Sequence, residues 1–391
     1  MKHSTIFWPW ATALLVAAAA LSLGVVAVVR SGGSDADHMS GSAMNSMMHG
    51  SDTGSTGMGS MMGSGSMGME SGSMGSNGSS PMSEHMAPAP QTGVENATAT
   101  RGGRPLAHTV DGDTWVFNLV AKPVKWEILP GTRVTAWAYN GTVPGPEIRV
   151  PYGQKVRVRV QNELTEPTSV HWHGIAVPNA MDGVPGVTQQ PIGVGKTFTY
   201  TFRAIPAGGG TGGTFLYHSH YDEDRQVGLG LSAPLVIVPP KPTAVYAAER
   251  TLLLAEWNLN PATGDTRPPM TMEGLLPNYF TINGKSYPAT EPINVKPGER
   301  VLLRLIGAGQ FNHPMHLHGT AFSVVAKDGH PLTTPDTVDV VDVAPGERYD
   351  IAFTVPRGKW ILHCHIGHHL TNNGASPGGL MTVIDATGKK L

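Results

Sequence analysis

Cysteine is almost absent from this chain. Cys364 is the only cysteine among 391 residues, so no disulfide can form within one chain. A lone thiol in an exported protein is a liability unless something occupies it. Charge is scarce too: 14% of the residues are charged and the net charge is −2, which favours neither a nucleic acid nor an acidic surface as partner. Beyond the N-terminus the sequence also lacks a convincing amphipathic helical pattern.

The N-terminal segment is one long apolar run from Ile6 to Val29, followed by Arg30. Its length suits a membrane-spanning helix better than the shorter apolar core of a cleaved signal peptide. It has no clear A-x-A cleavage site and no twin arginine. We therefore expect residues 1–30 to be an uncleaved signal anchor, with a cleaved signal peptide as the alternative. In either case the rest of the chain is expected to be exported: it would stay on the periplasmic side of the cell envelope if the segment is an anchor, and would be secreted if the segment is cleaved.

Residues 31–103 consist mostly of Gly, Ser and Met and show no hydrophobic periodicity. Such a segment cannot build a core, so a disordered linker is expected. Twelve of the eighteen methionines nevertheless fall between Met39 and Met86, together with His49 and His85. Thioethers are soft ligands that suit Cu(I), so this linker is either a copper-collecting arm or a spacer whose methionines absorb oxidation.

Short strand-like runs broken by Gly and Pro begin near Arg104, and about 290 residues of this kind predict an all-β fold of two β-sandwich domains. An internal repeat supports two domains, because several patterns recur at an offset of 145 residues. The Pro-rich run Pro239–Pro242 separates the copies, which gives domains 104–240 and 241–391. The recurring pairs are Ile148-x-Val150 with Ile293-x-Val295, Gly153 with Gly298, His171-Trp-His173 with His316-Leu-His318, and His218-Ser-His220 with His363-Cys-His365.

Histidines gather in four H-x-H units at these repeat-related positions. A single unit is usually structural, but alternate residues of a strand share one face, so four units predict a metal centre. In His363-Cys364-His365 the sulfur would point away from the imidazoles, and a thiolate with imidazoles is the ligand set of a trigonal copper site. One tripeptide could thus hold a copper on one side and a copper cluster on the other.

The two copies differ in the residues that a sulfur site needs. Ser219 stands where the second copy has Cys364, Thr168 stands where it has His313, and Asp224 stands where it has His369. Only the second domain can therefore hold a thiolate-bound copper.

The segments NGTVPGPEIRV, HWHG, YHSH, HPMHLHG and HCHIGHH resemble the copper motifs of multicopper oxidases over residues 104–391, and the two-domain layout resembles the small laccases. The resemblance implies two cupredoxin-like Greek-key domains, four coppers per chain and a homotrimer with clusters at its interfaces. Four one-electron oxidations of a reductant would be coupled to reduction of dioxygen to water, with Cys364 accepting each electron. The implied ligands are His313, Cys364 and His369 for type 1 copper; His171 and His316 for type 2; and His173, His218, His220, His318, His363 and His365 for the type 3 pair.

Three further residues stand beside these motifs. The usual axial position of type 1 copper falls on Gly374, so we expect Met381 as the weak axial ligand, with Leu380 beside a three-coordinate copper, or Met381 as a core residue, as alternatives. Asp182 matches an acidic position that assists proton delivery in this family, although Asp before Gly also forms turns. His368 is either a solvated neighbour of His369 or a landing point for a metal substrate.

The substrate is less constrained than the reaction. The Met-rich linker favours Cu(I), followed by phenolic or other organic reductants and then Mn(II) or Fe(II). Copper nitrite reductase is one alternative, but Ser219 and the eight paired histidines argue against it. A copper-buffering protein of the cell envelope is another, and the intact set of ten histidines and one cysteine argues against that.

Overall fold

The computed structural model describes residues 85–242, 244–271 and 274–388, all within one unit, Gly75–Leu391. The predicted signal anchor and the linker up to residue 84 lie outside the described residues. Residues 85–103, which were also expected to be disordered, are ordered instead: Glu95–Asn96 pair with Val124 and Lys125, and Ala89 is buried. Within the described ranges, no helix is long and apolar enough to cross a membrane.

Strand β6 (Lys155–Asn162), in which valine alternates with charged residues, lies inside the first sheet. Val156, Val158 and Val160 of strand β6 are buried while Arg159 is exposed, as expected for a strand with one face on a core. Strand β6 runs parallel to β3 and antiparallel to β8. The sheet comprises β1 (Glu95–Asn96), β2 (Thr109–Asp111), β3 (Thr114–Leu129), β4 (Thr132–Tyr139), β6 (Lys155–Asn162) and β8 (Thr197–Arg203).

A second sheet packs against the first and carries the first-half histidines. Its order is β5-β10-β9-β7, and residues of both sheets, among them Phe117, Trp172 and Tyr217, share one buried core. This is the two-layer arrangement of a β-sandwich. The elements are β5 (Ile148–Pro151), β7 (His171–His173), the 3-10 helix η1 (Asn179–Met181), β9 (Gly213–His218), α2 (Glu223–Gly228) and β10 (Ser232–Val238).

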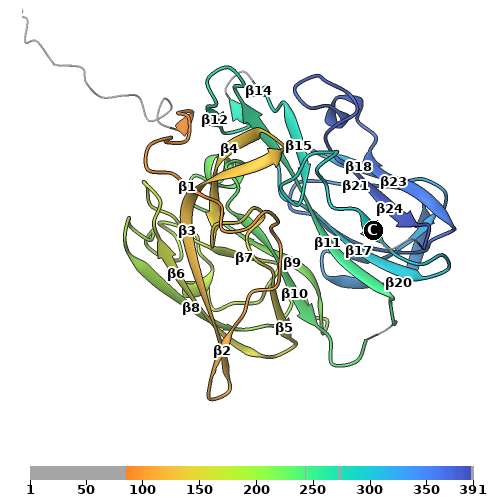
Figure 1. Cartoon of the computed structure of the whole chain (residues 1–391). Coiled ribbons are helices and arrows are strands. Elements are labelled where there is room, and N and C mark those ends of the chain that lie inside the picture. The colour runs from red at the N-terminus through yellow and green to blue at the C-terminus, as the bar shows by residue number, and fades with distance from the viewer. Residues whose placement is uncertain (1–84, 243, 272–273, 389–391) are drawn as a thin grey trace, which may run out of the picture. The chain divides into compact units, whose positions relative to one another are not determined.

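The second half repeats this plan. Its four-strand path β16-β24-β23-β18 matches β5-β10-β9-β7, and the pair His316 with His363 lies 145 residues beyond the pair His171 with His218. The repeat seen in the sequence is thus reproduced in strand pairing (Figure 1).

The second-half elements form three sheets. One contains β11 (Ala248–Leu259), β12 (Thr266–Arg267), β15 (Tyr279–Ile282), β17 (Arg300–Gly307), β19 (Phe322–Lys327), β20 (His330–Val338) and β22 (Arg348–Thr354). A small one pairs β13 (Met270–Thr271) with β14 (Gly274–Leu275). The histidine-bearing sheet contains β16 (Ile293–Asn294), β18 (His313–Leu317), β21 (Val340–Val343), β23 (Gly358–Cys364) and β24 (Met381–Ala386), with the 3-10 helix η2 (Gly367–Leu370) between the last two strands.

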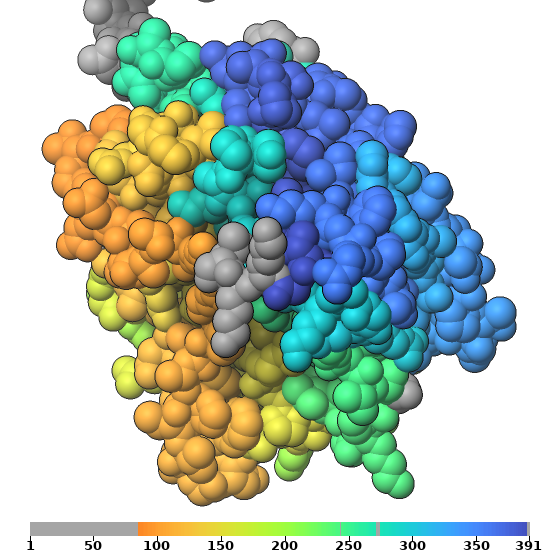
Figure 2. Space-filling view, turned by 45° about the vertical axis from the view of Figure 1, so that its right-hand side comes forward, coloured from red at the N-terminus to blue at the C-terminus, as the bar shows by residue number. Residues whose placement is uncertain are grey.

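The two halves meet along an apolar seam. Trp126 and Val143 of the first half share a buried cluster with Trp257 and Tyr279 of the second. Figure 2 shows the first-half surface in orange and yellow beside the second-half surface in cyan and blue. In the described ranges, no sheet joins strands from the two sides of the Pro239–Pro242 segment.

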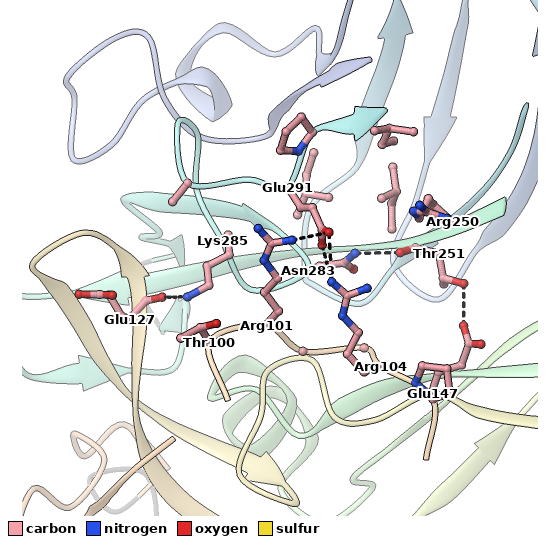
Figure 3. Close-up of a pocket in the computed structure, with 18 of the residues that line it drawn as sticks. Thr100, Arg101, Arg104, Glu127, Glu147, Arg250, Thr251, Asn283, Lys285 and Glu291 are labelled. Carbon is pink, nitrogen blue, oxygen red and sulfur yellow. Dashed lines mark hydrogen bonds and ion pairs between the residues drawn. The ribbon is translucent and has the colours of Figure 1, made fainter. Parts of the chain in front are cut away.

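A cavity of about 540 Å³ opens on this seam. Arg101 and Arg104 both point to the Glu291 carboxylate, and Lys285 donates to the backbone carbonyl of Glu127 (Figure 3). Its lining residues include no histidine. The cavity is therefore an interface feature, and the metal-binding groups lie elsewhere.

The all-β prediction is confirmed. The sequence reading missed α2, a single short turn of helix whose buried members are Arg225, Gln226 and Gly228. Six residues are too few for helical periodicity to stand out. The domain boundary at residues 239–242 stays a prediction.

Candidate metal centre

Strands β18 and β23 bring together the three residues predicted for type 1 copper. Cys364 Sγ lies 3.3 Å from His369 Nδ1, and His313 Nδ1 lies 3.3 Å from the same nitrogen. All three side chains are fully buried. His313 begins β18, Cys364 ends β23 and His369 lies on η2, so two neighbouring strands and the turn that follows them build the triad.

The chemistry of this triad fits copper. One sulfur and two imidazole nitrogens face one another, and Phe280 stacks on His369 at 4.3 Å between ring centroids. Burial lowers the pKa of His369 to about 3 and raises the pKa of the Cys364 thiol to about 11. The imidazole is thus neutral and ready to coordinate, and a metal must displace the thiol proton when it binds.

Strand register separates Met381 from the triad, contrary to its expected axial role. Met381 is the ladder partner of His363 and so shares the His363 face of the sheet, opposite Cys364. Leu380 instead accepts the Cys364 backbone N–H at 3.0 Å and belongs to the same buried cluster as Cys364. The register therefore favours the alternative, a three-coordinate site beside the apolar Leu380.

In the first half, polar side chains fill the corresponding place. Ser219 and Thr168 donate to the same oxygen, Gln226 Oε1, at 2.6 and 2.7 Å, and all three residues are fully buried. This network satisfies the buried hydroxyls and offers no thiolate or imidazole. Asp224, the counterpart of His369, contacts the His85 ring at 2.6 Å instead.

The first-half cluster histidines converge on one side of β7 and β9. His171, His173 and His218 place ring nitrogens within 4.8 Å of one another, and the His220 ring lies 5.5 Å from that of His171. Burial is the main reason that the pKa falls to about 4 for His173 and about 3 for His218. These imidazoles are neutral donors even in weak acid.

The second-half cluster histidines form a separate and more open group. His316, His318 and His363 form a second triad, and the His365 ring lies 5.6 Å from that of His316. His318 and His365 are exposed. Two histidines of each triad line a pocket, His316 and His318 one and His173 and His218 another, and no ring contact between the halves occurs among the described histidines. One chain thus assembles two half-clusters and does not bring them together.

A short covalent and hydrogen-bonded link joins the sulfur site to the second-half triad. Met315 is the ladder partner of Cys364 while His316 is the partner of His363, so sulfur and imidazole lie on opposite faces. His363 Nδ1 also lies 2.8 Å from the Cys364 carbonyl oxygen. The repeat has the same contact, between His218 Nδ1 and the Ser219 carbonyl.

Backbone carbonyls orient the two histidines predicted for type 2 copper. His171 Nδ1 lies 2.8 Å from the Asp182 carbonyl, and His316 Nδ1 lies 2.8 Å from the Asp339 carbonyl. The Asp182 carboxylate is itself 3.5 Å from His171 Nδ1. The proton-relay role of the Asp182 carboxylate stays a prediction. The Asp182 backbone carbonyl, by contrast, holds the His171 ring through Nδ1, so Nε2 is the nitrogen left for a metal.

Two further residues lie near the triad. His368 is exposed, and its ring covers that of His369 at 4.4 Å, so it is placed beside the sulfur site without joining it. Glu256 of β11 contacts His313 and was missed altogether, because it lies 57 residues away and belongs to no motif.

Comparisons with known proteins agree with this donor set. Two family models described as multicopper oxidase match residues 120–242 and 259–376. Multicopper oxidase MmcO of Mycobacterium tuberculosis is 32% identical over 69% of this chain and 58% of its own length. Copper resistance protein A of Pseudomonas syringae pv. tomato is 28% identical over 64% of this chain and 47% of its own.

Solved structures share the fold. A blue copper oxidase from Nitrosomonas europaea matches with a TM-score of 0.64 and 37% identity, over 69% of this chain and 85% of its own. A structure titled multicopper oxidase mgLAC matches with a TM-score of 0.63 and 37% identity, over 71% of this chain and 87% of its own. The chain spans about half the length of the curated relatives it matches.

The lowered pKa values of His173, His218 and His369 make the copper-free protein sensitive to acid. Between pH 6.5 and about 4 the unfolded chain binds protons on these rings that the folded chain does not, so stability falls as the pH falls. We expect His218→Gln to flatten this dependence by about 1.4 kcal/mol per pH unit, the value for one proton. Urea unfolding of the copper-free protein from pH 4.5 to 7 measures it, with the exposed His108→Gln as control. Parallel profiles for His218→Gln and the native chain would contradict the assignment.

Proposed function

The chain belongs to the multicopper oxidase family, and we propose that it couples four one-electron oxidations of a reductant to the reduction of dioxygen to two waters. The observation that carries this proposal is the alternation on β23, which puts Cys364 with two buried imidazoles on one face and His363 with the cluster histidines on the other. Members of this family bind four coppers of three types.

For the copper ligands we propose the same residues that the sequence motifs predict. His313, Cys364 and His369 would hold type 1 copper, and the eight paired histidines would hold the type 2 and type 3 coppers. When bound, these coppers supply the electron transfer and oxygen reduction that no side chain can perform. The protein holds the imidazoles in one tautomer, since His171, His218, His316 and His363 all direct Nδ1 to a backbone carbonyl. This leaves Nε2 as the nitrogen that can bind a metal, and in His218 and His363 it faces a neighbouring histidine ring. Asp182, beside His171, is the proposed proton relay.

Cu(I) is the proposed reductant, with phenolic compounds as the second candidate. The Met-rich segment supplies soft thioethers, and one relative of this chain is named as a copper resistance protein. We also propose that residues 1–30 anchor the protein to a membrane, with the folded part on its outer side.

The other candidate functions find less support. A nitrite reductase of this architecture needs a thiolate copper in the first half, where Thr168, Ser219 and Gln226 fill the place instead. A copper buffer does not need a thiolate site and imidazole cluster linked through one tripeptide.

The proposed assembly is a homotrimer in which the first half of one copy faces the second half of the next. Within one chain the two triads stay apart, and His318 and His365 are exposed. A second copy that covers them would complete a cluster whose ligands are otherwise divided.

Cys364→Ser tests the function. The only thiolate is lost, so we expect the blue absorption band and oxygen uptake with Cu(I) or a phenol to disappear while the cluster coppers stay. Copper analysis, a visible spectrum and an oxygen electrode measure this, and nitrite consumption should be absent in both proteins. Met381→Leu is the matched control and should keep the blue band unchanged, because Met381 lies on the other face. A blue Cys364→Ser protein would refute the type 1 assignment.

Complementation tests the trimer. The chain from about residue 104 should sediment as three copies. His171→Ala removes a first-half ligand and His316→Ala a second-half ligand, so each variant should be inactive alone. If clusters form between copies, refolding the two variants together should restore part of the activity, because some interfaces then combine two intact halves. Active monomers, or no recovery in mixed trimers, would show that each chain closes its own cluster.

Substituting the methionines between Met39 and Met86 by serine tests the linker. If it collects Cu(I), it raises the local concentration near the enzyme through a tether. We expect slower Cu(I) oxidation at low copper and unchanged oxidation of an organic phenol, measured as oxygen uptake. Serine is preferred to leucine because leucine would add apolar bulk. Equal Cu(I) kinetics would reduce the segment to a spacer.

A further inference from the structure

Glu256 is a fully buried carboxylate placed against a ligand of the sulfur site. Its Oε1 accepts from His313 Nε2 at 2.7 Å, and both side chains are fully buried. The backbone N–H groups of Gln310 and Phe311 donate to the same carboxylate at 3.0 and 3.4 Å. Within the described ranges, no lysine or arginine forms an ion pair with it.

The loop before β18 is shaped around this carboxylate. A Cβ on Gly309 would lie 1.7 Å from Glu256 Oε2, so this position has no room for a side chain. Residues 309–311 thus wrap the carboxylate closely and supply two of its three hydrogen bonds. The arrangement fixes where the negative charge lies relative to the His313 ring.

The contact determines which nitrogen of His313 can bind a metal. A carboxylate accepts hydrogen bonds, so His313 Nε2 carries the proton and the lone pair remains on Nδ1. Nδ1 is the atom that faces His369 at 3.3 Å. His369 differs, because its Nε2 is buried without a hydrogen-bond partner in the described part of the chain.

We propose that Glu256 is a positioning residue that holds His313 in its metal-binding tautomer and lowers the reduction potential of the type 1 site. A buried negative charge one imidazole away stabilises the oxidised site more than the reduced one, because the oxidised site carries one more positive charge. The sulfur site is thereby matched to reductants that give up an electron easily, such as Cu(I). This inference rests on the proposed type 1 assignment.

The decisive variant is Glu256→Gln. An amide oxygen can still accept from His313 Nε2, so the tautomer should persist while the charge is lost. We expect the reduction potential of the type 1 site to rise by about 59 mV, which for a one-electron couple is a tenfold change in the equilibrium constant. At the potential where the native site is half reduced, the variant would then have a tenfold higher ratio of reduced to oxidised copper. Redox titration of the blue band measures this shift in the copper-loaded protein.

A second readout needs no copper. In copper-free protein, ¹⁵N NMR of the His313 ring should show a protonated Nε2 in the native chain and in Glu256→Gln, and loss of that preference in Glu256→Ala. Glu147→Gln is the matched control, since Glu147 is also a buried carboxylate, bonded to Arg149 and Thr251 on the seam. It should change neither the potential nor the tautomer.

The possible outcomes distinguish a failure of this inference from a failure of the type 1 copper assignment on which it rests. A native protein without a blue band would refute the type 1 site itself. A blue Glu256→Gln protein with the native potential would overturn the role of the charge and leave Glu256 as a tie between β11 and the loop. If Glu256→Gln does not fold, Glu256→Asp decides, since the shorter side chain keeps the charge but withdraws it from the His313 ring: a raised potential supports the proposal and an unchanged one overturns it.

Discussion

The organisation of this protein depends on the alternation of side chains along two paired strands. Because β18 pairs with β23 in one register, Met315 and Cys364 share the buried face while His316 and His363 share the other. A shift of one residue would exchange the faces and separate every ligand from its partners. The register is held on both sides of β23, by β18 and by β24, so two ladders fix the geometry of one tripeptide.

The two faces provide opposite environments, and each suits its proposed role. On the sulfur side, His313, Cys364 and His369 are fully buried. The other side leaves His318 and His365 exposed to solvent. The first half has the second environment without the first, because the network of Thr168, Ser219 and Gln226 closes its buried side with hydrogen bonds.

Much of this could be predicted from the sequence because the repeat and the H-x-H spacing report local geometry directly. Alternate residues of a strand share a face whatever the rest of the fold does, so the histidine groups and the opposite face of the sulfur could be predicted from their positions. The division of these ligands among three types of copper came from the resemblance to multicopper oxidases. Met381 did not follow, because Leu370–Gly379 leaves the strand and only the re-entry register decides which of Leu380 and Met381 faces the sulfur. Glu256 was out of reach for a different reason: it meets His313 only through the packing of β11 against the loop at 309–311, and nothing in its own neighbourhood marks it.

Buried ionisable groups destabilise a fold unless they are neutral or compensated. The imidazoles of His218 and His369 meet this condition by staying neutral, since burial lowers the pKa of each to about 3. Glu256 is compensated by three hydrogen bonds, two from backbone N–H groups and one from His313. Such a carboxylate is better stabilised once a positive metal centre lies beyond His313, so the fold and the proposed type 1 copper favour each other through the same imidazole.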